Sequence, residues 1–598
     1  MSKFDFSCCR IIITLSLYLS IICVDVYSQS SDHNCILNRI FTDSSGSTYQ
    51  DKIDYYDGLG RLEQSIIGYS HWDTDLITFQ EYDSFGRISN QWLPASIQNN
   101  GGDYLSPAVI KNRFDALYSD AFPYSKNIYE NSPLNRVLEQ YGAGQDWHNN
   151  NKSVVTTYNT NMSNSDVLNC KLYQVGGSRQ KPLLNQNGNY TNGELYVTEV
   201  RDENGTMFYE FKDKQDRLVL TRNIIDHTMY DTYYIYDDYS NLCFVLPPRV
   251  DDEGYSQANL DKFTFQYRYD ERNRCIAKKM PGSDWVYYIY DESDRPIFSQ
   301  DGEQRRKEQW MFNVFDSFNR VVLTGLCKNI FDYLADPLKT VAVKVTWMGD
   351  INVTKGYAMT GITLVNPVVL SVNYYNNYSF LGKNGIPVET DSSVSYDTAA
   401  ESEGFGQRYT ASAQGLLTGM LTARLDDSAI PSYDYSVLYY DSYGRLIQTK
   451  SNNHLPGGIE KEYVAYNFVG QPIRRKHVHS ASGKSTQTEV YSYTYDHAGR
   501  LLTTTHQLND GSPVVLVSNE YDELGRLKSN NRNGLSNLKT DYTYNVRSWV
   551  KSITCPLFNV SLYYNERRPN GTNVSCYNGN ISGIDWNVSG DKARGYNF

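Results

Sequence analysis

Short stretches of alternating apolar and polar residues recur along most of the chain, and a tight-turn signal stands beside each of them. Tyr491–Tyr495 alternates before one such signal, and Arg445–Lys450 alternates after another. A period of two residues places successive side chains on opposite faces of a strand. The pattern therefore predicts β-strands joined as hairpins, with few long apolar stripes of helical spacing.

The turn signal is a hexapeptide, Tyr-Asp-x-x-Gly-Arg, and Tyr521–Arg526 is one copy of it. Adjacent copies start about 21 to 33 residues apart, within the range of repeat architectures. Further copies begin at Tyr56, Tyr82, Tyr440 and Tyr495, and Asn replaces Gly in the copies that begin at Tyr269 and Phe315. Less regular copies surround them, as at Tyr236, Tyr290, Tyr466 and Tyr544.

Each position of the hexapeptide has a structural reason. Asp followed three residues later by Gly or Asn suits a type I turn, because Asp hydrogen-bonds the backbone two residues on and Gly or Asn tolerates a positive φ. Arg is predicted to pair with this Asp or to stack on a Tyr of its own or a neighbouring hairpin. We therefore interpret the following residues as structural repeat turns rather than catalytic groups: Asp57, Gly60, Arg61, Asp83, Gly86, Arg87, Asp270, Asn273, Arg274, Asp316, Asn319, Arg320, Asp441, Gly444, Arg445, Asp496, Gly499, Arg500, Asp522, Gly525 and Arg526.

These copies, with their flanks, resemble the YD repeat of Rhs proteins and teneurins, and are most similar to the secreted Rhs-like proteins of Bacteroidetes. Four stretches carry the resemblance: Tyr233–Pro248, Tyr267–Asp291, Trp310–Gly325 and Tyr577–Gly583. It extends from about Asp51 to the end of the chain. The resemblance implies an all-β fold in which repeated hairpins form a large curled sheet, or a hollow spiral shell that encloses a C-terminal polypeptide.

The expected organisation has five parts. Residues 1–28 form a signal peptide, and residues 29–193 form the β-rich N-terminal domain that the resemblance implies. A block of YD repeats covers residues 194–330, an irregular β segment of the shell covers 331–431, and a second repeat block covers 432–598. In complete Rhs proteins an Asp-Pro-x-Gly core motif and a variable toxin follow the repeats. Asp336-Pro337 is followed by Leu338 and Lys339, so we expect the core motif and the toxin to be absent from this sequence, which then corresponds to a truncated product or to a shell that another chain completes.

The beginning of the chain predicts export. Lys3 and Arg10 precede an apolar run from Ile11 to Val24, which is short for a membrane span. We expect cleavage before Gln29, in preference to a lipoprotein signal that uses Cys23. The protein is then extracellular or held at the outer-membrane surface, without a transmembrane span after cleavage.

Composition agrees with an exported β-protein. The chain has 52 Tyr residues, which favour strands, and its formal net charge of −12 argues against a nucleic-acid-binding surface. Seven Cys remain after Ser28, an odd and scattered set that does not form a disulfide framework. We expect at most one or two bridges, with most of these Cys as buried small apolar residues.

The sequence offers little catalytic or metal-binding chemistry. His477 and His479 share a strand face and would hold a metal only with a third ligand, so we favour a polar exposed strand there. Gly142–His148 is glycine-rich, but it lacks the Gly-Lys-Ser/Thr ending of a phosphate loop and no helix pattern follows it. Calcium on paired Asp residues such as Asp237-Asp238 is a minor alternative. We expect no enzyme activity, no cofactor and no metal site.

Three functional hypotheses remain open. The first is the shell of an Rhs-type polymorphic-toxin system for bacterial competition, without its effector, with a toxin polypeptide or a shell-completing chain as partner. The second is an adhesion or carbohydrate-binding protein whose aromatic strips, such as Tyr233–Tyr236 or Tyr491–Tyr495, bind surface glycans. More often such strips are cross-strand pairs that hold a sheet together. The third is an enzyme within residues 331–431.

Overall fold

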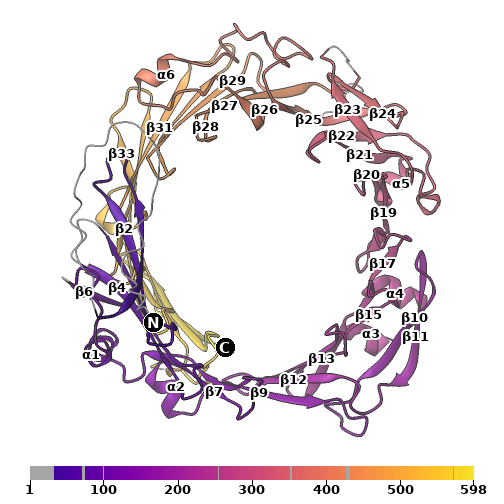
Figure 1. Cartoon of the computed structure of the whole chain (residues 1–598). Coiled ribbons are helices and arrows are strands. Elements are labelled where there is room, and N and C mark those ends of the chain that lie inside the picture. The colour runs from indigo at the N-terminus through magenta and orange to yellow at the C-terminus, as the bar shows by residue number, and fades with distance from the viewer. Residues whose placement is uncertain are drawn as a thin grey trace, which may run out of the picture.

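A computed structural model describes residues 32–69, 74–98, 100–253, 255–349, 353–425, 431–569 and 571–598. The signal peptide expected at residues 1–28 lies outside this part of the chain. Most of the regular structure is β-strand, and nearly all strands belong to one antiparallel sheet. The predicted all-β fold, built from hairpins that join into one large curled sheet, is confirmed (Figure 1).

The first section of the sheet runs from residue 34 to residue 160. Strand β4 pairs with both β5 and β6, and β5 continues the sheet through β7. Its elements are β1 (Asn34–Phe41), β2 (Tyr49–Tyr56), β3 (Leu62–Tyr69), β4 (Thr74–Tyr82), β5 (Ile88–Trp92), β6 (Ala95–Gln98), α1 (Pro107–Tyr118), β7 (Tyr124–Tyr129), β8 (Val137–Tyr141), α2 (Gln145–Asn149) and β9 (Ser153–Thr160).

The second section is a meander in which each strand pairs with the next. Strand β9 pairs with β12, so the hairpin of β10 (Lys171–Ser178) and β11 (Lys181–Asn189) stands outside the sheet. The meander contains β12 (Tyr196–Arg201), β13 (Met207–Lys212), β14 (Leu218–Ile225), β15 (Thr228–Tyr236), β16 (Leu242–Leu246), α3 (Pro248–Glu253), α4 (Gln257–Phe263), β17 (Phe265–Tyr269), β18 (Cys275–Lys279), β19 (Val286–Tyr290), β20 (Pro296–Gln300), α5 (Gly302–Arg306), β21 (Trp310–Phe315) and β22 (Val321–Cys327).

The irregular middle of the sequence contributes two strands to the same sheet. Strand β22 pairs with β25 (Val368–Asn376), which pairs with β26 (Ala413–Ala423). Between and beside them lie η1 (Tyr333–Ala335), the separate hairpin of β23 (Lys344–Trp347) and β24 (Tyr357–Thr360), and α6 (Ala399–Ser402). The sheet continues through β27 (Tyr433–Tyr440), β28 (Leu446–Asn452) and β29 (Ile459–Tyr466).

The last section continues the meander to the end of the chain. It contains β30 (Pro472–Ser480), β31 (Gln487–Tyr495), β32 (Leu501–Leu508), β33 (Val514–Tyr521), β34 (Leu527–Arg532), η2 (Ser536–Leu538), β35 (Lys539–Tyr544), β36 (Val550–Cys555), β37 (Phe558–Tyr563), β38 (Gly583–Val588) and β39 (Arg594–Asn597). The sheet is therefore a single ribbon whose strands follow the chain order.

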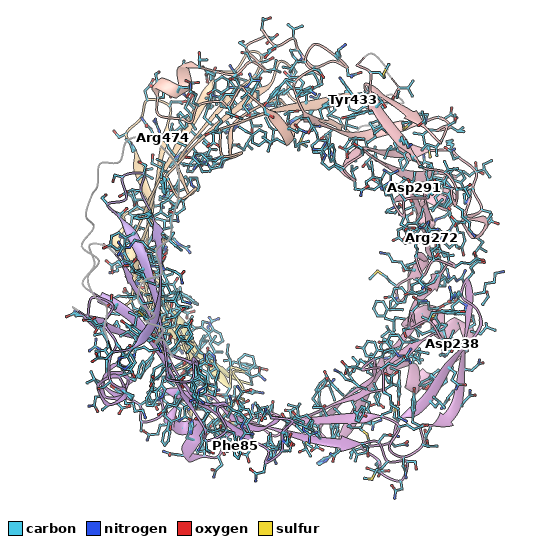
Figure 2. The ribbon with its side chains drawn as sticks, viewed as in Figure 1. Phe85, Asp238, Arg272, Asp291, Tyr433 and Arg474 are labelled. Carbon is cyan, nitrogen blue, oxygen red and sulfur yellow. The ribbon has the colours of Figure 1, made fainter. Side chains whose placement is uncertain are left out.

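This ribbon curves around a central opening, and its last section returns to overlap its first (Figure 1). The side chains of the wall leave the centre of the ring open (Figure 2). A right-handed twist between neighbouring strands accumulates over many strands, and a long sheet curls for this reason. The fold is a curved wall, one sheet thick.

The hydrophobic cores lie between this wall and the segments that cover its outer face. Helices α1 and α2, the hairpins β10–β11 and β23–β24, and α6 all lie on the outer side of the ring (Figure 1). Phe114 of α1 packs in one core, Tyr173 of β10 in a second, and Phe380 of the middle segment in a third. The covering segments therefore bury the outer face of the wall.

No helix is predicted from the sequence, so all of the helices that the structure describes are additions to that prediction, among them the short α2 and α6. Helix α2 (Gln145–Asn149) lies almost wholly within the glycine-rich stretch Gly142–His148, and strand β9 is the next element after it. Helix α6 (Ala399–Ser402) lies within the irregular segment 331–431. Both helices are short, and tertiary packing stabilises them: Trp147 and Ala400 are buried.

The cysteines of the described chain form no bridges. Cys170, Cys243 and Cys327 are buried, whereas Cys35, Cys275, Cys555 and Cys576 are half-buried. The expectation that most of them are buried small apolar residues holds for three of the seven.

Lys450 gives a test of the packing between the wall and its covering. Its side chain is fully buried, and its ammonium donates to the Tyr463 hydroxyl at 2.7 Å. Burial lowers the pKa of Lys450 to about 7, although Asp397 nearby opposes this effect. Between pH 7 and about 10.4, the unfolded chain therefore binds a proton that the folded chain does not bind, so this group makes the protein more stable as pH rises.

We expect Lys450→Met to raise the unfolding temperature at pH 7 and below, and the gain to shrink as pH approaches 10. Thermal unfolding at pH 6, 8 and 9.5 measures this. Lys528, an exposed lysine on β34 several strands away, gives the control Lys528→Met, for which we expect no pH-dependent gain. A gain for Lys450→Met that does not change with pH would contradict the account.

Candidate functional site: the curved wall and its seam

The Asp of each repeat organises its turn through both carboxylate oxygens. In the first copy, Asp57 Oδ1 accepts the backbone N–H groups of Leu59 and Arg61, each at 2.9 Å. Its Oδ2 accepts the Arg61 Nε–H at 2.8 Å, and Gly60, with φ of 78°, closes the turn onto the Asp57 carbonyl. The backbone and side-chain bonds from Arg61 lower the pKa of Asp57.

The same Asp–Arg ion pair forms in every predicted turn of the hexapeptide. Asn273 and Asn319, which replace Gly, have φ of 60° in each case. The paired residues are Asp57–Arg61, Asp83–Arg87, Asp270–Arg274, Asp316–Arg320, Asp441–Arg445, Asp496–Arg500 and Asp522–Arg526. In the less regular copy that begins at Tyr466, two amide side chains stand in place of the Asp and the Arg. Asn467 Nδ2 donates a hydrogen bond to Gln471 Oε1 at 2.9 Å.

Each Arg also connects its own hairpin to the next one. The Arg500 guanidinium lies 4.6 Å from the ring centroid of Tyr521, and the Tyr521 hydroxyl donates back to the Leu501 carbonyl at 3.0 Å. The arrangement recurs with Arg61 over Tyr82, Arg87 over Tyr129, Arg274 over Tyr290, Arg445 over Tyr466 and Arg526 over Tyr544. Turn, ion pair and Tyr therefore form one repeating cross-link along the ribbon.

Because two antiparallel strands separate consecutive turns, all of these turns lie along one edge of the wall, which we call the turn edge. The other ends of the strands form the opposite edge. At the turn edge Arg272 donates to the Glu292 carbonyl at 3.1 Å, which joins the turn of Asp270 to that of Asp291 (Figure 2).

The ring closes where the turn edge of the last section meets the opposite edge of the first section. The ring of His497 lies 4.6 Å from that of Tyr69, at the end of β3. The Ser96 hydroxyl, in β6, donates to the Glu523 carboxylate. Tyr577 donates its backbone N–H to Asn204 Oδ1 at 2.7 Å, and Asn578 Nδ2 donates to Asp202 Oδ2 at 2.8 Å. We call these contacts the seam.

Arg547 is a largely buried side chain of the seam. Its guanidinium lies 3.8 Å from the Trp147 ring centroid, its Nε–H donates to the Ala143 carbonyl at 2.7 Å, and its Nη1 lies 3.4 Å from Glu203 Oε1. Gly142 permits this approach, since a Cβ there would lie 2.2 Å from Arg547 Nη2. Burial lowers the pKa of Arg547 to about 10.

From β30 to β35 the inner face of the wall carries many polar side chains. On β30, Lys476 contacts Glu403 next to the outer helix α6, so the alternate residues His477 and His479 face the central opening. The strand registers place further side chains on this same face of the following strands: Tyr493, Thr504, Asn519, Asn530 and Thr540. Hydroxyl, amide and phenol groups therefore predominate on this part of the inner face.

His477 and His479 share a face as predicted, and both contact one carboxylate. His477 Nε2 lies 2.8 Å from Glu460 Oε2, and His479 Nδ1 lies 2.6 Å from Glu460 Oε1. Both rings are half-buried, in contrast to the exposed strand that was favoured. Within the described ranges, no group of three or more His, Cys, Asp or Glu is arranged to hold a metal ion.

The Tyr233–Tyr236 strip borders a cavity of about 740 Å³ between hairpin β10–β11 and the turn edge. Its alternating residues divide between the two faces, and Tyr233 is buried against Tyr173. Glu194, Asp213 and Asp238 add carboxylates to the lining. Asp213 is already paired with Arg217 at 2.7 Å, as a turn residue.

Comparison with known proteins gives one family and several structures. Residues 36–160 match the model of a domain of unknown function (DUF6443). No curated protein matches the chain. Among solved structures, a TcdB2-TccC3-TEV crystal structure is similar with 12% identity and a TM-score of 0.41 over 98% of this chain and 28% of that one. A TcdB2-TccC3-Cdc42 crystal structure is similar with 12% identity and a TM-score of 0.39. The match covers 94% of this chain and 27% of that one. The structure of the Tc holotoxin pore of Photorhabdus luminescens is similar with 12% identity and a TM-score of 0.38. The match covers 94% of this chain and 26% of that one.

The chain thus spans about a quarter of the length of the solved chains that it matches. Among the residues that the structure describes, no helix is long and apolar enough to cross a membrane.

The ion pair of Asp291 and Arg295 is a deeply buried example of the repeating Asp–Arg pair, and its removal tests how much the pair stabilises the fold. Its side chain is fully buried, and its Oδ2 accepts Arg295 Nη2 at 2.5 Å (Figure 2). We expect Asp291→Ala to cost about 3–5 kcal/mol of unfolding free energy, because Arg295 is left as an unpaired buried charge. The matched change Asp57→Ala, at a more exposed turn, is expected to cost less. Equal losses in urea unfolding would show that burial of the pair is unimportant.

Arg547 tests the seam. We expect Arg547→Ala to release the last section from the first, so that amide hydrogens near residues 143–147 and 545–549 exchange faster. Arg272→Ala is the matched control, since Arg272 has the same position in its turn but lies far from the seam and is partly exposed. Unchanged exchange in Arg547→Ala, or equal acceleration in both variants, would contradict the assigned role.

Proposed function

We propose that this protein is a secreted or cell-surface scaffold of the Rhs type, whose curved wall encloses a polypeptide. The observation that carries the proposal is the one-sided covering of the wall. The helices and separate hairpins gather on the outer face, while the inner face remains bare sheet around a central opening (Figure 1). A surface that the chain itself leaves uncovered is available to a guest molecule.

The chemistry of the inner face suits a polypeptide guest. Tyr, Thr and Asn side chains offer hydrogen bonds to any backbone without requiring a particular sequence. In this proposal the protein belongs to a polymorphic-toxin system for bacterial competition, the guest is a toxin chain, and the wall itself catalyses no reaction.

A second candidate function is glycan binding. The cavity beside hairpin β10–β11 favours it, because Tyr190, Tyr234 and Tyr236 stand there beside carboxylates, a combination that suits sugar rings and their hydroxyls. Glycan-array binding by the whole chain that is lost in Tyr236→Ala would favour this function over the scaffold.

The scaffold is tested with a reporter peptide fused after Phe598, whose end of the chain lies at the inner side of the ring (Figure 1). We expect the fused reporter, which carries a protease site, to be cleaved at least about tenfold more slowly than the free reporter, because the wall excludes the protease. Arg547→Ala should restore rapid cleavage, and Arg272→Ala should not. Cleavage of the fused reporter at the rate of the free peptide would refute enclosure.

A further inference from the structure

The seam shows how one edge of this wall recognises another. Three of the seam contacts come from one of the two residues that follow the Asp or Asn of a turn: His497 and Glu523 at the first position, and Arg547 at the second. They reach an edge that offers aromatic rings, free carbonyls and glycines, as at Trp147, Ala143 and Gly142. These turn positions are therefore the docking positions of the turn edge.

In several turns of the rest of the ring, although not in that of Asp270, where Arg272 stands, the second of these positions carries a large apolar side chain that remains exposed. The exposed fractions are 79% for Leu59, 76% for Phe85, 66% for Phe318 and 77% for Tyr443. Single exposed apolar residues are ordinary on a protein surface, but here they recur at one turn position along one edge. The edge that carries them is continuous with the docked edge at the seam.

The aromatic members of this set are held in place by their own turns. The Arg87 guanidinium lies 5.1 Å from the Phe85 ring centroid, Arg320 lies 5.1 Å from Phe318, and Arg445 lies 4.9 Å from Tyr443. Arg covers one side of each ring and leaves the rest exposed. Side chains that are ordered before binding lose little conformational entropy when a partner covers them.

At the seam, the turn edge of one section contacts the opposite edge of another. The exposed turn edge is therefore expected to contact a surface of the same kind, an opposite edge. Within the described chain, the last section covers the opposite edge only along the first strands, up to the turn of Asp202. Farther on, the opposite edge carries exposed Met280 after β18 and exposed Leu425 after β26. One copy of the chain therefore presents both members of the contact.

We propose that the exposed turn edge docks onto the opposite edge of a second copy of this chain, so that walls stack head to tail in the manner of the seam. Such a contact is heterologous, since the two edges differ, and it adds copies along one axis. The proposal goes beyond the scaffold function and does not depend on a guest. Its failure would leave the reporter experiment unaffected.

Sedimentation velocity of the whole protein, over two decades of concentration, tests the proposal. We expect reversible association of the unmodified chain, and association about tenfold weaker or more in Phe85→Ser/Phe318→Ser/Tyr443→Ser, because these side chains are buried in the contact. The control is Val109→Ser/Val388→Ser, which removes exposed apolar side chains from the outer covering. A chain that stays monomeric throughout, or control and triple variants that lose association equally, would overturn the proposal.

Cross-linking between isotope-labelled and unlabelled copies tests the direction of stacking. The proposal predicts links from the turn edge of one copy to the opposite edge of the other. Links that join two turn edges would overturn the head-to-tail arrangement.

Discussion

The contact on which the structure depends is the Asp–Arg pair of the repeating turn. Asp alone would form the turn, since its Oδ1 already bonds two backbone N–H groups. Arg adds the connection between hairpins, because it pairs with its own Asp and covers the Tyr of the following hairpin. A long sheet with little core on its inner face needs such links, since edge-to-edge pairing of single hairpins is marginally stable.

The seam gives the ribbon its closure. A single sheet that continued to curl without contact between its sections would leave both long edges solvated over their whole length. At the seam the chain instead buries Arg547 and Trp147, with Glu203 as partner for the guanidinium. The glycines at 142 and 144 are needed there, because side chains at those positions would occupy the space of Arg547 and Trp147. Local turn chemistry thus builds the wall, strand twist curls it, and a few long-range contacts join its last section to its first.

The local part of this account could be predicted from the sequence, and the long-range part could not. Asp, Gly and Arg at fixed spacing define a turn and its flanking strands without any other information. Helix α1 had a signal that the sequence analysis missed: Ser106-Pro107 starts it, and Ile110 and Phe114 follow at helical spacing. Arg547 had none, since its partner Ala143 lies 404 residues away. The cavity beside β10–β11 exists because this hairpin stands outside the main sheet. The alternation of apolar and polar residues does not show which hairpins join the sheet and which stand apart.

The most direct test of the account is a cross-link across the seam. Asn578 and Asp202 are hydrogen-bonded at 2.8 Å although 376 residues separate them. If the ribbon closes as described, the double variant Asp202→Cys/Asn578→Cys forms an intrachain disulfide under mild oxidation, and mass spectrometry of its peptides identifies that bond in most molecules. If the two cysteines stay reduced in a folded chain, or link only between chains, the wall does not close on itself and the central claim is wrong.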